Sequence, residues 1–220
     1  MMAAMSKPKL ESPDLERLFL RSGEKRLYRS GDMLFEKGEP AANVGYILQG
    51  QARTFCLNTE GDETTLFYIG KGNMICTESL TAHASVIVSV QAISPVKLCL
   101  LPGSTFLQLW QKNDWPIQEL ITHFVRRTTL LSDYLCCVRL QESDKKVAYF
   151  LHSCYDPADP VVSYTNEQIA TVVGLNRITT NRVLNRFARE GIVRLGYRRV
   201  EILQPERLAV MSDGLGYFDA

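Results

Sequence analysis

The stretch TNEQIATVVGLNRITTNRVLNR, residues 165–186, constrains the fold more tightly than any other part of the chain. Thr165 followed three positions later by Gln168 is the pattern of a capping box, in which each side chain satisfies a free backbone N–H at a helix start. Gly174 stands where a left-handed residue would end that helix, and Asn176 can cap a second one. Two short helices in succession, the second with arginines on its outer face, predict a helix-turn-helix.

Basic residues are concentrated around this predicted helix pair. The whole chain is nearly balanced, with 25 basic and 24 acidic residues, yet residues 176–200 hold seven arginines and one acid, Glu190. A solvated helix face is the ordinary explanation for a run of arginines. Its coincidence with the helix pair instead favours a DNA-facing surface. Residues 191–204 read as a small hairpin beside the pair, a wing whose Arg194, Arg198 and Arg199 could contact phosphates.

The N-terminal half has a different pattern, in which short apolar runs are interrupted by glycines between residues 28 and 102. Many short strands separated by turn signals favour a sandwich or barrel over a parallel sheet. The stretch NTEGDE, residues 58–63, has the composition of a hairpin connection because glycine supplies the positive φ that a tight turn needs. We therefore expect a β domain over residues 1–114.

A heptad seam follows this β domain. Its members are separated alternately by four and three positions: Ile117, Ile121, Phe124, Thr128, Leu131, Leu135 and Val138. A buried core helix is also apolar on one face, but so narrow a seam favours pairing of two helices in a homodimer. We expect a dimerisation helix over residues 115–141 and the DNA-binding domain over residues 142–220.

Several classes of protein are disfavoured by what the sequence lacks. No apolar run approaches the roughly 20 residues that span a membrane, and the N-terminus lacks the hydrophobic core of a secretion signal, so a cytoplasmic location is expected. The six cysteines are expected to be reduced there, and none forms a C-x-x-C pair that would suggest zinc. No nucleophile, P-loop or metalloprotease motif is present, so we expect neither catalytic residues nor an enzyme.

The order of β-roll, long helix and winged helix-turn-helix, an α+β architecture, resembles the CRP/FNR family of bacterial transcription regulators. The stretches GDMLFEKGEPAANVGYILQGQAR (31–53) and TNEQIATVVGLNRITTNRVLNRFAREGIV (165–193) carry the resemblance. It implies a cyclic-nucleotide-binding-type β-roll that senses a small-molecule effector, a homodimer, and double-stranded DNA as partner. RNA polymerase would be a further partner of an activator, and activation and repression both stay open.

Two departures from the family pattern bear on the effector. Members that bind cyclic AMP carry an Arg-Ser pair where Val86 and Ile87 stand here, and a buried phosphate needs such a charge partner. Members with an iron–sulfur cluster use N-terminal cysteines, whereas the first cysteine here is Cys56. Cyclic AMP and an iron–sulfur cluster are therefore both disfavoured.

A third departure lies in the second helix of the pair. Ile178 occupies a position where many members place a glutamate that reads cytosine, and isoleucine can instead contact a thymine methyl. The halorespiration-regulator (CprK-like) branch has a similarly apolar residue, and the chain looks closest to that branch. An A·T-rich palindromic operator is the resulting prediction. The predicted DNA contacts, with Arg182 the strongest candidate, are Thr165, Arg177, Ile178, Thr179, Asn181 and Arg182.

The effector itself is underdetermined. Polar and aromatic candidates for the pocket are Tyr68, Glu78, His83, Arg127 and Ser132, which would suit a small aromatic or organic-acid effector. Haem held by Cys76 and His83 is an alternative that would make the protein a gas sensor, and a redox switch at Cys136 and Cys137 is another. From a different class, a β-roll could serve as a ligand-binding regulatory subunit without binding DNA.

Overall fold

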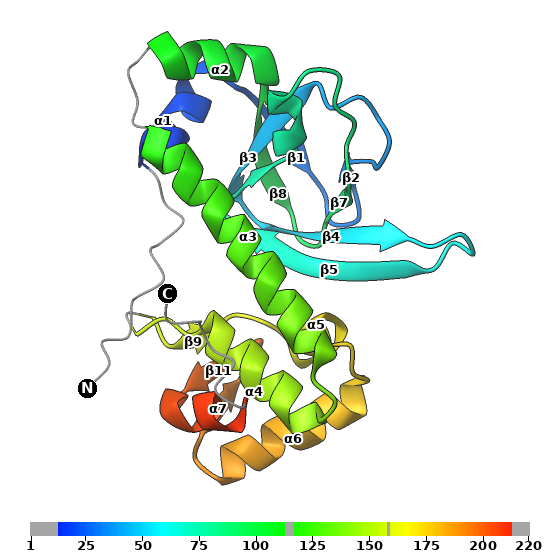
Figure 1. The fold of residues 1–220 in the computed structure, drawn as a ribbon, viewed down its shortest axis with the longest axis vertical. Coiled ribbons are helices and arrows are strands. Elements are labelled where there is room, and N and C mark those ends of the chain that lie inside the picture. Colours follow the sequence, from blue (N-terminus) through cyan, green and yellow to red (C-terminus); the bar gives the residue numbers. More distant parts are fainter. Residues whose placement is uncertain (1–12, 113–116, 158, 213–220) are drawn as a thin grey trace. The chain divides into compact units, whose positions relative to one another are not determined.

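The computed structural model describes residues 13–112, 117–157 and 159–212. The chain divides between residues 123 and 124 into two compact units, which are treated separately below. Figure 1 shows the succession of elements in each unit. None of the helices in the described ranges combines the length and hydropathy that crossing a bilayer requires.

The N-terminal unit is a β-roll with a helix on each side of it in the sequence. In chain order its elements are α1 (Pro13–Ser22), β1 (Glu24–Tyr28), β2 (Met33–Phe35), β3 (Asn43–Gln49), β4 (Gln51–Leu57), β5 (Glu63–Gly70), β6 (Met74–Ile75), the 3-10 helix η1 (Thr77–Leu80), β7 (Ser89–Ala92), β8 (Val96–Pro102) and α2 (Gly103–Lys112). The strands form two antiparallel four-stranded sheets, ordered β1-β8-β3-β6 and β2-β7-β4-β5. This arrangement confirms the predicted β-roll.

Hydrophobic residues from both sheets fill the interior of the roll. One cluster joins Ile47 and Leu98 of the first sheet to Ala52, Ile69 and Val90 of the second. A second cluster packs α1 and α2 against the first sheet, with Phe19 stacked on Tyr46 at 5.1 Å between ring centroids. Burial of apolar surface between layers is the main stabilising contribution to such a sandwich.

Two glycines allow close backbone approaches that shape the roll. Gly50, with φ +90°, turns the chain between β3 and β4, and a Cβ there would lie 2.1 Å from the Pro95 carbonyl oxygen. Gly103 begins α2 where a Cβ would lie 1.8 Å from the Ser79 carbonyl oxygen. Because Gly103 has no side chain, α2 can pack closely on η1, the element that carries Glu78.

The long helix α3 (Ile117–Arg139) continues across the division between the units. Five members of the predicted seam are between 40% and 60% exposed in the single chain: Ile117, Ile121, Phe124, Leu131 and Leu135. The polar seam member, Thr128, is also exposed, and its hydroxyl donates to the Phe124 carbonyl at 3.1 Å. The helix therefore presents an apolar stripe rather than burying it within the chain.

The C-terminal unit is a winged helix-turn-helix. Its elements after α3 are α4 (Ser143–Cys154), β9 (Val161–Val162), α5 (Asn166–Val173), α6 (Arg177–Arg189), β10 (Val193–Gly196), β11 (Arg199–Ile202) and α7 (Pro205–Met211). The three strands form one antiparallel sheet in the order β10-β11-β9. Leu151, Ile169, Leu184, Phe187 and Leu208, each completely buried, come from all four helices of this unit that follow α3. The predicted helix pair and hairpin are thus confirmed as elements of one compact fold.

Candidate nucleic-acid interface and effector region

The helix pair is fixed by the caps that the sequence indicates. The Thr165 hydroxyl accepts a hydrogen bond from the Gln168 backbone N–H at 3.1 Å, and the Thr165 N–H donates to Gln168 Oε1 at 2.8 Å. Gly174 adopts the left-handed conformation, with φ 65°, that ends α5. Asn176 then caps α6, because its Oδ1 accepts from the Thr179 N–H at 2.8 Å. These contacts set where α6 begins and hence which of its side chains face outward.

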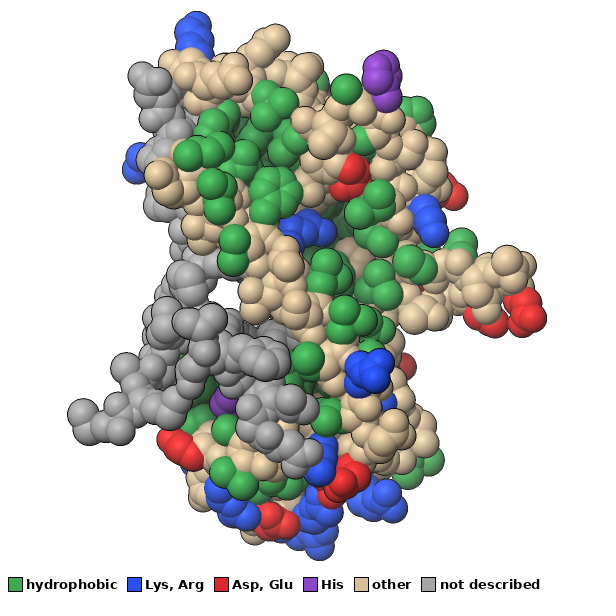
Figure 2. Space-filling view, viewed as in Figure 1, with side chains coloured by type: hydrophobic (Ala, Val, Ile, Leu, Met, Phe, Trp, Pro, Cys, Tyr) green, Lys and Arg blue, Asp and Glu red, His purple; other side chains and the backbone are tan. Residues whose placement is uncertain are grey.

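The outward face of α6 is a stripe that we call the α6 stripe: Ile178, Arg182, Asn185 and Arg189. All four are exposed, Ile178 at 82%, and their spacing of three and four residues places them on one side of the helix. The opposite side is buried and packs into the domain core through Thr180, Val183, Leu184 and Phe187. Arginine and lysine side chains, with acids among them, gather on the C-terminal unit in Figure 2.

Asn185 belongs to the α6 stripe although it was absent from the residues predicted to contact DNA. It lies three positions after Arg182 and seven after Ile178, so helical periodicity alone would have found it. Asparagine carries both a donor and an acceptor, which suits contact with base edges or phosphates.

The other predicted contacts lie on the flank of the stripe or beside it. Arg177 is exposed at the start of α6, whereas Thr165, Thr179 and Asn181 are half-buried. Asn181 is also engaged, because its Oδ1 accepts a hydrogen bond from Asn166 Nδ2 at 2.7 Å. Five of the six predicted residues therefore lie in the first half of α6 and Thr165 at the start of α5, and they differ in exposure.

Arg186 does not join the α6 stripe. Its guanidinium forms an ion pair with Asp144 at the start of α4, lies 3.8 Å from Glu190 and stands over the Phe187 ring. The hydrogen bond to Asp144 is the main cause that raises the pKa of Arg186, with the charges of Asp144 and Glu190 adding to it. Arg186 thus ties α6 to α4.

The wing carries further exposed cations. Between β10 and β11, Tyr197 is 91% exposed and Arg198 adopts a positive φ of 54°. Arg198 and Arg199 are exposed, while Arg194 pairs with Glu201 across the hairpin at 2.8 Å. Two of the three wing arginines therefore stand at or beside the tip, where they can approach a backbone phosphate.

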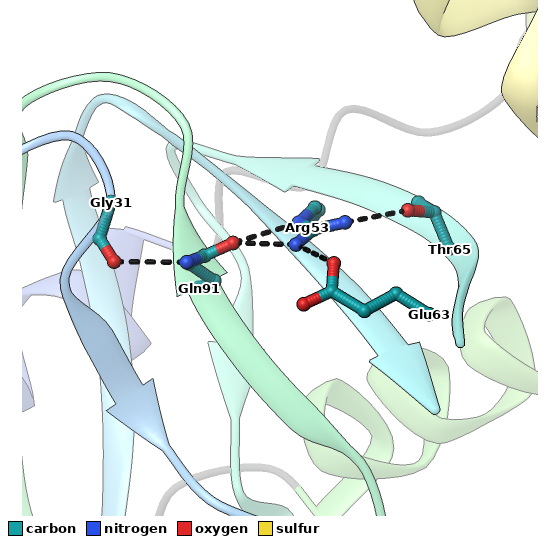
Figure 3. Close-up of polar contacts among 5 residues, drawn as sticks. All are labelled: Gly31, Arg53, Glu63, Thr65 and Gln91. Carbon is teal, nitrogen blue, oxygen red and sulfur yellow. Dashed lines mark hydrogen bonds and ion pairs between the residues drawn. The ribbon is translucent and has the colours of Figure 1, made fainter. Parts of the chain in front are cut away.

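In the β-roll, Tyr68 lies on a polar face rather than in the apolar interior. The register pairs Ala52 with Ile69 in the inner cluster and Arg53 with Tyr68 at the next position, so alternation turns Tyr68 the other way. On that face Arg53 contacts Glu63, Thr65 and Gln91, and Gln91 in turn donates to the Gly31 carbonyl at 2.9 Å (Figure 3). This network ties β4 to β5 and β7, and it has no local signature because its members are far apart along the chain.

Glu78 makes a contact that bears on ligand chemistry. Its Oε1 accepts a hydrogen bond at 2.9 Å from the backbone N–H of Ile87, one of the two positions where cyclic-AMP-binding relatives are expected to carry Arg-Ser. Val86, the other position, is buried. A negative charge already occupies this donor, and it would repel a phosphate placed there.

The two residues of the haem alternative have dissimilar surroundings. Cys76 is buried, and desolvation, followed by the negative charge of Glu78, raises the pKa of its thiol to about 12. His83 is exposed, with a φ of 56°. Among the described residues no group of three or more His, Cys, Asp or Glu side chains could hold a metal ion.

Arg127 and Ser132 lie on the part of α3 that belongs to the C-terminal unit, where Arg127 is half-buried and Ser132 exposed. The five predicted effector residues are therefore divided between the two units. Within the N-terminal unit, Glu78 and His83 lie in the segment around η1, whereas Tyr68 lies on β5.

A β-roll followed by a winged helix-turn-helix with an exposed, cationic second helix defines a DNA-binding regulator of transcription with an N-terminal effector domain. A family model described as a cyclic nucleotide-binding domain matches residues 25–113, and one described as a Crp-like helix-turn-helix domain matches residues 145–211. The chain belongs to the CRP/FNR family of transcription regulators, and its relatives are regulators rather than enzymes.

The relatives span nearly the whole chain. The cyclic AMP receptor protein of Thermus thermophilus is 27% identical over 205 residues, which is 93% of this chain and 95% of the relative. FixK2 from Bradyrhizobium japonicum has a TM-score of 0.68 at 18% identity, covering 90% of this chain and 99% of its own. OCPA-complexed CprK also has a TM-score of 0.68, at 15% identity and with coverages of 89% and 92%. The two structures support the fold alone.

Proposed function

We propose that the chain acts as a homodimer that binds a palindromic, A·T-rich operator, and that effector binding in the β-roll switches its affinity for DNA. The work is divided among an effector domain (1–114), a dimerisation helix (115–141) and a DNA-binding domain (142–220). Such a regulator acts on the chromosome, in the cytoplasm.

The α6 stripe is the observation that carries this proposal. Arg182 can donate to guanine O6 and N7 or to phosphate, Asn185 can both donate and accept, and Ile178 can contact a thymine methyl. Arg198 and Arg199 of the wing supply phosphate contacts beside it. Base contact by an apolar side chain at position 178 is the reason for proposing A·T pairs in the half-site.

Dimerisation rests on the exposed seam of α3. A stripe of large apolar side chains spaced by four and three residues is the pattern that two helices bury against each other. A two-fold dimer would present two copies of α6, which explains why a palindrome is proposed. The two helices would enter successive major grooves about 34 Å apart.

We favour a small aromatic or organic-acid effector over a cyclic nucleotide. The contact between Glu78 and the Ile87 N–H places a carboxylate where a phosphate would need a donor. Haem has weaker support, because the two residues that would hold it have dissimilar surroundings: Cys76 is buried, whereas His83 is exposed. The organic-acid alternative is compatible with Glu78 only if the acid group is held elsewhere.

Selection of duplexes from a random library, followed by affinity measurements, tests the proposal. We expect an enriched palindrome whose affinity falls by about 5-fold to 150-fold in Arg182→Ala, corresponding to about 1–3 kcal/mol for a lost base contact. Arg26→Ala, which removes the same charge from the exposed strand β1, is the matched control and should bind as wild type. Recovery of no motif, or equal losses in both variants, would refute it.

A further inference from the structure

The turn at the tip of the wing contains a residue that does not suit its backbone conformation. β10 ends at Gly196 and β11 begins at Arg199, so Tyr197 and Arg198 form the turn. Arg198 adopts a positive φ of 54°, a conformation that is unfavourable for most residues and that glycine or asparagine adopts more readily. Tight hairpin turns usually carry those two residues. Strain that is kept at such a position indicates that the side chain has a function.

The three arginines of the wing differ in their surroundings. Arg194 pairs with Glu201 across the two strands at 2.8 Å. The Arg199 side chain lies over the opposite strand, because a Cβ at its partner Gly196 would lie 2.8 Å from Arg199 Nε. Arg198 is exposed, and its guanidinium takes part in no hydrogen bond or ion pair among the described residues. Arg198 is therefore a cation at the tip that is available to a ligand.

The base of the hairpin is fixed to the C-terminal end of α6. The Ile192 N–H donates to the Phe187 carbonyl at 2.9 Å, and the Leu203 N–H donates to the Ile192 carbonyl at the same distance. Ile192 and Val200 are completely buried. In duplex DNA each phosphate backbone separates the major groove from the minor groove. With α6 in the major groove and the wing on the adjoining backbone, the groove beyond the tip is the minor groove.

We propose that Arg198 enters the minor groove next to the half-site and favours A·T pairs there. This inference rests on the proposed function, since it requires α6 to occupy the neighbouring major groove. A narrow, A·T-rich minor groove has an enhanced negative potential that attracts arginine. A G·C pair adds the guanine N2 amino group to this groove, and that donor cannot accept from a guanidinium. The wing thus extends the sequence that the protein reads beyond the pairs that α6 contacts.

Base analogues distinguish this contact from one to the major groove or to phosphate. An inosine–cytosine pair keeps the major-groove face of G·C but lacks the N2 amino group, whereas diaminopurine–thymine adds that group to an A·T pair. Replacing the flanking A·T pairs of a selected operator by G·C or diaminopurine–thymine should weaken binding by about 5-fold or more. Inosine–cytosine should bind about as well as A·T. Fluorescence anisotropy at one fixed salt concentration measures the four affinities.

The variant Arg198→Gly removes the side chain and the strain together. The four duplexes should then bind with equal affinity, while resistance to urea stays at least as high as in wild type. Arg194→Ala, which removes another cation of the wing, is the matched control and should keep the wild-type order of affinities.

Three results would overturn the inference. Wild-type affinity that ignores the flanking pairs, or that follows their major-groove face, would exclude a minor-groove contact. A loss in Arg198→Gly that is equal for all four duplexes would show that Arg198 contacts phosphate only. If wild type selects no operator, the proposed function fails instead.

Discussion

Ile178 is a large apolar side chain left 82% exposed at the start of a helix whose other exposed residues are polar or charged. An exposed isoleucine adds little to the stability of the fold because its apolar surface stays in water, and a thymine methyl is an apolar group that it can contact. The substitution Ile178→Glu should therefore replace the preference for an A·T pair with a preference for a pair that presents the cytosine amino group. A change of about 1–3 kcal/mol, or about 5-fold to 150-fold in the ratio of affinities, is expected.

Fluorescence anisotropy with operators that differ at one pair would measure this exchange. Ile178→Val, which keeps a branched apolar side chain, is the control and should retain the A·T preference. A guanine–cytosine requirement in wild type would contradict the assignment of Ile178.

Cys76 offers a prediction about pH. Burial and the Glu78 charge raise the pKa of its thiol from 9.0 to about 12, so at pH 8 its thiolate fraction should be roughly a thousandfold below that of an ordinary thiol. The folded chain holds this proton more tightly, and the free energy of unfolding should therefore fall as pH rises from about 9 towards 12.

Mass spectrometry of iodoacetamide-treated native protein should find Cys56, which is half-buried, modified well before Cys76. Equal rates in native protein would contradict this.

At the scale of single elements, the caps of α5 and α6 have the clearest energetic consequence. Thr165→Ala removes the hydroxyl that accepts from Gln168 and should lower the free energy of unfolding by about 1 kcal/mol. Thr165→Ser keeps the hydroxyl and should cost much less. Urea denaturation of both variants measures the difference, and identical losses would show that the capping bond is not the cause.

The elements of the DNA-binding unit could be predicted because their signals are local. The box formed by Thr165 and Gln168, the glycine at 174 and the cap at Asn176 each act within a few residues, and each was observed. Asn185 was missed although periodicity pointed to it. The Asn166–Asn181 and Asp144–Arg186 contacts join different helices, so they depend on how those helices pack and have no signature within a single helix.

The effector region was harder to predict for the same physical reason. Tyr68 faces the Arg53 network because of the register between β4 and β5, which shifts by one residue near Thr54 and Phe55. A single-residue slip turns every side chain to the other face, and turn composition alone does not reveal it. Glu78 and Ile87 are nine positions apart in the sequence, so the hydrogen bond between them likewise depends on how the intervening chain folds back.

At the scale of the whole molecule, the α3 seam predicts the oligomeric state. Leu135→Glu places a charge near the C-terminal end of the proposed interface and should convert the dimer to a monomer, because burying an unpaired carboxylate is costly. Thr122→Glu, an exposed position on the opposite side of the same helix, is the matched control. Sedimentation equilibrium of both variants measures this. A dimer that tolerates Leu135→Glu would place the interface elsewhere.

The most direct measurement is the affinity of the protein for two copies of the selected half-site as their spacing is varied. With two recognition helices on a two-fold dimer, affinity should be highest when the half-site centres are about 10–10.5 base pairs apart. Insertion of half a helical turn, about 5 base pairs, should reduce it to nearly that of a single half-site. Affinity that does not depend on spacing would contradict a dimer reading a palindrome through α6.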